Sequence, residues 1–157
     1  MATEQQSSEA LVRIRVPLEQ SPGGSPEDDW LWAEPLGSGR FRVESSPFFA
    51  YGISRDDVVH ATPAADEEEP RLEDVIEKGG HRTLRIALDP GTELTGGAVQ
   101  GLLERLLELG CTHETLRPKL VVLDVPAEVD VGVVVQLLQA LADDGTMLWE
   151  WADPRPS

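Results

Sequence analysis

The fold is decided by one stretch of the chain, from Arg82 to Ala152, which reads RTLRIALDPGTELTGGAVQGLLERLLELGCTHETLRPKLVVLDVPAEVDVGVVVQLLQALADDGTMLWEWA. Strand-like and helix-like patterns follow one another along it as strand, helix, strand, strand, helix, strand. This βαββαβ order predicts a ferredoxin-like domain over residues 80–153, with an antiparallel sheet in the order 4-1-3-2. The strands Thr83–Leu88 and Lys119–Val125 are then the two central ones.

Two amphipathic helices are predicted within this stretch, because leucines and valines recur at three- and four-residue spacing. Thr95 is the expected N-cap of the first helix, and Gly110 follows its last turn as a C-terminal cap. Asp130 is the expected N-cap of the second helix. Both helices cover the same face of the sheet, so its other face needs a cover.

The first half of the chain is the expected cover for that second face. We expect Trp149 and Trp151, which alternate on the last strand, to fill the contact between the halves. Alternating patterns in the first half predict five strands. They are Leu11–Leu18, Trp30–Glu34, Arg40–Glu44, Asp57–Thr62 and Arg71–Lys78.

The predicted fold class is therefore α+β. A disordered tail over residues 1–9 precedes a small β-barrel-like N-terminal subdomain over residues 10–78. That subdomain packs on the ferredoxin-like C-terminal subdomain, and Gly79-Gly80 marks the boundary between them.

Charge limits the classes of partner. The chain has 29 acidic and 13 basic residues, a net charge of −16. Residues 1–80 carry 17 acids against 7 bases and residues 81–157 carry 12 against 6, so both halves are acidic. Such a field repels phosphate backbones and anionic lipids and attracts cationic proteins. We therefore expect no nucleic-acid partner and no membrane partner.

Cysteine usage and hydropathy favour the cytoplasm. Cys111 is the single cysteine, so neither an intrachain disulfide nor a cysteine-based metal site is expected. No apolar run approaches the roughly 18 residues of a membrane span. The first residues also lack the pattern of a secretory signal.

The most site-like segment is Gly79–Arg85, GGHRTLR. On a strand, His81, Thr83 and Arg85 project from one face, and such a row could bind a carboxylate or a phosphate. The alternative is that this row faces the first half of the chain and pairs with its acids.

A second candidate is the aromatic run Pro47–Gly52, PFFAYG, in which Phe48 and Tyr51 could line an apolar ligand pocket. Core packing of a small barrel explains the same residues. No catalytic constellation is recognisable, and we expect no cofactor. We expect no metal either, because Asp56, Asp57 and His60 do not form a ligand motif with the other histidines.

Several blocks together resemble a family. They are Trp30–Gly37, Phe41–Glu44, Pro47–Gly52, Asp57–Val59 and Gly79–Arg85. They are similar to a small bacterial family of domains of unknown function, over roughly residues 11–150. The resemblance implies a soluble bacterial protein and carries no catalytic residues with it.

Two functional hypotheses follow. The first is a non-enzymatic acidic binding protein, of the immunity or adaptor type, that recognises a basic protein or peptide. The second is a sensor or enzyme for a small anionic ligand, which would use a cleft between the subdomains and contact the ligand through His81 and Arg85.

Overall fold

The computed structural model describes residues 11–18, 28–63, 69–116 and 119–153. The predicted tail over residues 1–9 lies outside this part of the chain. The elements of the described residues follow in the order β1 (Val12–Pro17), β2 (Asp28–Gly37), β3 (Arg40–Val43), β4 (Val58–Pro63), β5 (Pro70–Glu77), β6 (Arg82–Leu88), α2 (Gly97–Leu109), β7 (Thr112–Leu116), β8 (Leu120–Val125), α3 (Val131–Asp143) and β9 (Met147–Asp153).

The first five strands form a closed barrel. Successive strands pair antiparallel, and a parallel pairing of Arg15 in β1 with Arg71 in β5 closes the barrel. Alternate residues point inward, as expected for strands with one buried face. The barrel core contains Ile14, Val16, Leu31, Ala33, Val43, Ala50, Ile53, Val59 and Ala61.

The remaining strands form a separate antiparallel sheet in the order β7-β8-β6-β9. This is the predicted order 4-1-3-2, so the prediction that β6 and β8 are central is confirmed. The hydrophobic run of β8 fits this position, since Val121, Val122 and Leu123 are each at most 1% exposed.

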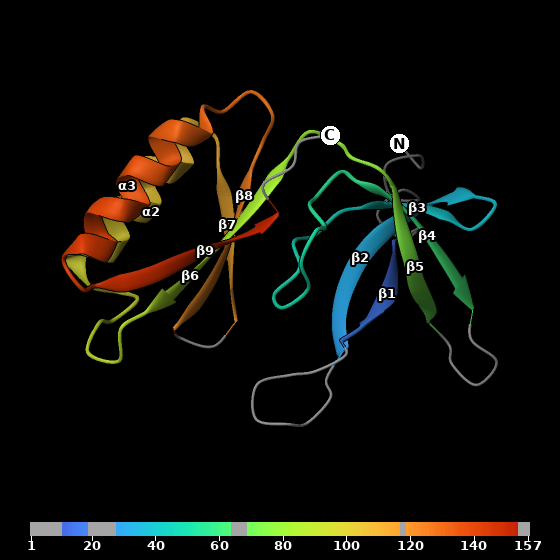
Figure 1. The fold of residues 1–157 in the computed structure, drawn as a ribbon, viewed down its shortest axis with the longest axis horizontal. Helices are drawn as coiled ribbons and strands as arrows, with labels where there is room; N and C mark the ends of the chain where they lie inside the picture. The colour runs from blue at the N-terminus through green and yellow to red at the C-terminus, as the bar shows by residue number, and fades with distance from the viewer. Residues whose placement is uncertain (1–10, 19–27, 64–68, 117–118, 154–157) are drawn as a thin grey trace, which may run out of the picture.

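Helices α2 and α3 pack on one face of this sheet, and the barrel lies on the side of its other face (Figure 1). The capping prediction for α3 is confirmed, since the Asp130 side chain accepts a hydrogen bond from the Gly132 backbone N–H. The prediction for Thr95 is wrong. A turn, in which the Gly96 N–H donates to the Glu93 carbonyl, delays the start of α2, and Gly96 becomes its N-cap without a side-chain bond.

The expected position of the two tryptophans is also wrong. Trp149 is paired with Ile86, and Trp151 with Leu84, whose side chains contact the helices. Paired residues of neighbouring strands project from the same face, so both indoles lie on the helix side of the sheet. Trp149 Nε1 donates to Gln139 of α3 at 3.0 Å. The two-residue spacing of Trp149 and Trp151 predicts that both indoles lie on one face of the sheet. The pairing of β9 with β6 determines that this is the helix side.

Neither α2 nor α3, the helices of the described residues, has the length and apolarity needed to cross a membrane.

The packing of α2 gives a test of the helix faces. Leu106 is 1% exposed in the core, whereas its neighbour Leu107 is 63% exposed. We expect Leu106→Ala to lower the free energy of unfolding by about 2–5 kcal/mol, because it leaves a cavity. The control Leu107→Ala should change it by about 0.5 kcal/mol or less. Urea denaturation measures both, and equal effects would contradict the assigned faces.

Candidate functional site at the junction of barrel and sheet

The segment between β3 and β4, residues 44–57, connects the barrel to the uncovered face of the second sheet. The Gly52 N–H donates to the Ala152 carbonyl of β9 at 2.9 Å. Figure 1 shows this segment reaching from the barrel towards β6 and β9. We call the contact between this segment and the sheet, together with Lys78 and Gly79, the junction.

Arg85 is the central side chain of the junction. It projects from β6 and is only 5% exposed. One terminal nitrogen donates to the Phe48 carbonyl at 2.8 Å, and the other donates to the Ala50 carbonyl. Burial lowers the pKa of the guanidinium, while the neighbouring charges of Glu150 and Asp29 act to raise it. Arg85 therefore holds the segment through backbone carbonyls.

Tyr51 covers Arg85 from the solvent side. Its ring centroid lies 4.7 Å from the Arg85 guanidinium carbon, a cation–π contact. The ring is 63% exposed, and its hydroxyl donates to both carboxylate oxygens of Glu150 at 2.9 Å. This hydrogen bond is the main reason why the pKa of Tyr51 is raised.

Thr83 lies deeper in the junction, where it is fully buried. Its hydroxyl is 2.8 Å from the Ser54 hydroxyl and also donates to the Ile53 carbonyl. Ser54 in turn donates to the Asp153 carboxylate of β9 at 2.6 Å. These short polar side chains connect β6, β9 and the barrel segment without any contact with solvent.

Lys78 completes the junction from the end of β5. Its ammonium group donates to two fully buried carboxylates, Asp57 and Asp153, and to the Gly52 carbonyl at 3.3 Å. Buried carboxylates need such a partner, because an isolated charge in the interior carries a large desolvation penalty. Lys78 thereby links the barrel, the segment and the last strand.

The connection between the two halves is packed tightly. The Gly79 N–H donates to Asp57 at 2.9 Å. A Cβ atom at Gly79 would lie 2.2 Å from the Asp56 carbonyl oxygen, so no other residue fits there without a shift of the backbone. Gly80 has a φ of +102°, a conformation that favours glycine.

His81 lies beside the junction and has a different partner. Its Nδ1 is 2.8 Å from the Asp124 carboxylate of β8. Burial raises the pKa of Asp124, and the hydrogen bond with His81 opposes that shift. The imidazole and the Arg85 guanidinium thus serve separate contacts.

Four of the five predicted site residues come together at the junction, namely Phe48, Tyr51, Thr83 and Arg85. They contact the protein itself, as the alternative interpretation of the polar row expected, although Arg85 binds carbonyls rather than acids of the first half. Sequence reasoning missed Lys78, Asp57 and Asp153. Asp57 lies 21 positions and Asp153 lies 75 positions from Lys78 in the sequence, so no local pattern could have indicated their contact.

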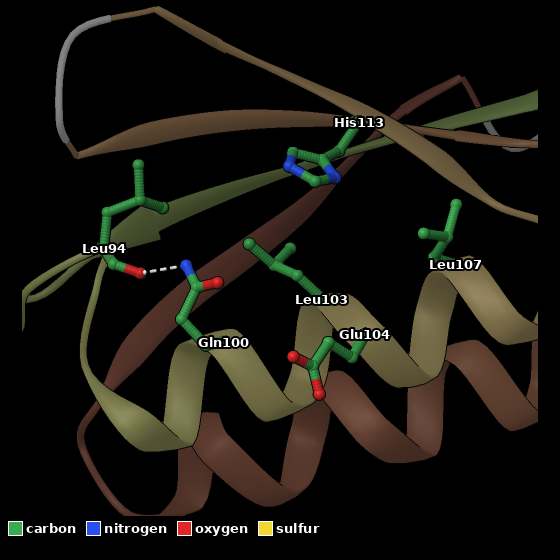
Figure 2. Close-up of a pocket in the computed structure, with 6 residues that line it drawn as sticks. All are labelled: Leu94, Gln100, Leu103, Glu104, Leu107 and His113. Atoms are coloured by element: carbon green, nitrogen blue, oxygen red, sulfur yellow. Dashed lines mark hydrogen bonds between the residues drawn. The ribbon is translucent and has the colours of Figure 1, made fainter.

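A shallow groove occurs elsewhere, between α2 and β7, with a volume of about 250 Å³ (Figure 2). It is lined by Leu94, Gln100, Leu103, Glu104, Leu107 and His113. Three of these side chains are apolar and can pack against an apolar group, and the other three are polar. Within the described ranges, no group of three or more histidine, cysteine or acidic side chains is placed to hold a metal ion.

Comparison with known proteins identifies the type of domain. A family model described as Domain of unknown function (DUF4265) matches residues 29–149. No curated protein matches the chain. A solved structure of a hypothetical protein from Neisseria gonorrhoeae is similar, with a TM-score of 0.75 and 14% identity over 91% of this chain and 94% of that chain. This likeness concerns the fold alone.

The role of Arg85 can be tested by truncation. We expect Arg85→Ala to lower the free energy of unfolding by roughly 3 kcal/mol, because it leaves two carbonyls of the junction without their charged donor. The exposed Arg105→Ala is the control and should change it by about 0.5 kcal/mol or less. An unchanged melting temperature for Arg85→Ala would refute the structural role.

Cys111 should be chemically inert in the native protein. It is 1% exposed, and burial raises the pKa of its thiol to about 11. At about pH 8 almost no thiolate is present to react. We expect labelling by a thiol reagent such as DTNB only after unfolding in denaturant. Rapid labelling of the folded protein would show that the site is open.

Proposed function

The chain belongs to this family of domains of unknown function, and we propose that it is a non-enzymatic binding protein that recognises a basic protein or peptide. An immunity-type or adaptor role fits this activity. The observation that carries the proposal is that Arg85, the predicted anion-binding group, and Lys78 are both used in the junction. The surface then offers mainly carboxylates.

Charge supports a cationic partner. Among the described residues, burial removes four aspartates from the surface, namely Asp29, Asp57, Asp124 and Asp153, along with Arg85 and most of Lys78. Most of the excess negative charge therefore stays exposed. Its field would accelerate the approach of a basic partner and repel nucleic acids and anionic lipids.

The outer surface of the barrel contributes to this field. On β5, Glu73, Asp74 and Glu77 are exposed within one short strand. Asp74 lies 3.9 Å from His60. Exposed pairs of this kind are weak, so the carboxylates remain accessible to a competing cation.

We further propose that residues 80–153 are a ferredoxin-like domain and that the protein acts in the cytoplasm. The element order βαββαβ and the sheet order β7-β8-β6-β9 support the first proposal. The single, buried Cys111 supports the second, since cytoplasmic proteins keep their thiols reduced.

Salt dependence tests the function. Immobilised protein should retain a basic protein from bacterial lysate in stoichiometric amount at about 0.01 M salt and bind it far more weakly at about 0.15 M, because the screening length falls from about 30 Å to about 8 Å. The association rate with the purified partner should fall in parallel.

The control is a thermal-shift screen with anionic metabolites, which should not stabilise the protein. An association rate that is indifferent to salt would contradict the proposal. So would an increase of several degrees in melting temperature with an anionic ligand, since that result would favour a small-molecule sensor.

A further inference from the structure

One border of the second sheet is open. Strand β7 is the outermost strand of the sheet, and among the described residues no strand pairs with its outer edge. The backbone N–H and C=O groups along such an edge can pair with an added strand. At the opposite border, the Gly52 N–H donates to the Ala152 carbonyl near the end of β9.

The open edge of β7 lies beside the groove against α2. His113 reaches from β7 over the groove, and Leu103 and Leu107 form its floor and one end (Figure 2). Leu107 is 63% exposed, so its side chain is available for an apolar contact beside the edge of β7. The edge offers main-chain hydrogen bonds, and the groove offers a place for an apolar side chain.

The charged residues around the groove favour a basic partner. The groove is bordered by Glu104, with Glu108 one turn further along α2 and Glu114 on β7, and all three are exposed. Arg105 is the exposed base of the same helix. A second copy of this chain would bring a further charge of −16 to an already acidic edge. A segment with basic side chains would instead be attracted to it.

We infer that a basic partner binds in extended form along the outer edge of β7, with apolar side chains in the groove against α2. This inference rests on the proposed function and names the surface that would carry it. An added strand projects alternate side chains to opposite faces. Apolar side chains at every second position of the added strand would enter the groove. Basic side chains at the positions between them would project from the opposite face, near Glu114.

The test uses a labelled peptide of about ten residues in which valine and lysine alternate, a length typical of a long strand. Fluorescence anisotropy at low salt measures its affinity, and amide chemical shifts of the ¹⁵N-labelled protein locate it. We expect the largest shifts within Thr112–Leu116. Methylation of alternate peptide nitrogens should abolish binding for one parity only, because only one set of N–H groups faces β7.

Protein variants provide matched controls. Leu107→Ser should weaken binding by about tenfold, as the loss of one buried leucine contact implies. Leu148→Ser changes a leucine that is 73% exposed on the other face of the sheet and should leave the affinity unchanged. Glu114→Gln should weaken binding, because the basic side chains approach Glu114, whereas Glu128→Gln, at an exposed site outside the groove, should not. Melting curves confirm that each variant is folded.

The outcomes separate this inference from the proposed function. Salt-sensitive binding that Leu107→Ser and Leu148→Ser affect equally would overturn the docking surface and leave the proposed function standing. Absent binding of the peptide at low salt would overturn the inference alone. Salt-insensitive capture of a basic protein in the lysate experiment would count against the proposed function itself. A concentration-dependent dimer in sedimentation, lost in Leu107→Ser, would also overturn the inference, because a second copy would then be the occupant.

Discussion

The antiparallel sheet has helices on one face only, and the rest of the structure depends on how its second face is covered. The cover is a chain segment with its own backbone polar groups, so the contact has to satisfy hydrogen bonds as well as exclude water. Arg85 supplies donors for the carbonyls of Phe48 and Ala50. Lys78 supplies the positive charge between Asp57 and Asp153. A buried charge pair adds little net stability, but it admits few alternative geometries. The junction therefore determines how the halves fit together more than how strongly they adhere.

Much of the fold could be predicted from the sequence because its signals are local. Period-two alternation marks the strands, three- and four-residue spacing marks α2 and α3, and the handedness of crossovers fixes the order of the second sheet. Features that depend on pairing between distant strands could not be read in this way. The closure of the barrel through Arg15 and Arg71 is one example, and the face of Trp149 and Trp151 is another.

The candidate site was predictable in part, for the same reason. Alternation correctly places Thr83 and Arg85 on the face opposite the helices. Their partners could not be predicted, since Arg85 binds backbone carbonyls, which every residue has. Lys78 and Asp153 are 75 positions apart in sequence, so no local pattern indicates their contact. The groove beside β7 is likewise formed by residues of α2 and β7 that share no motif.

Gly79 gives the connection between the halves an unexpected character. Two successive glycines usually indicate a hinge, but here the space beside the first is filled by the backbone of Asp56. The connection is tightly packed, and together with the contacts of Arg85 and Lys78 it defines one relative orientation of barrel and sheet. Mutation can then alter outward residues of α2, β5 and β7 without disturbing that orientation. Homologous chains could thus differ in the partner they bind and keep the same relative orientation of barrel and sheet.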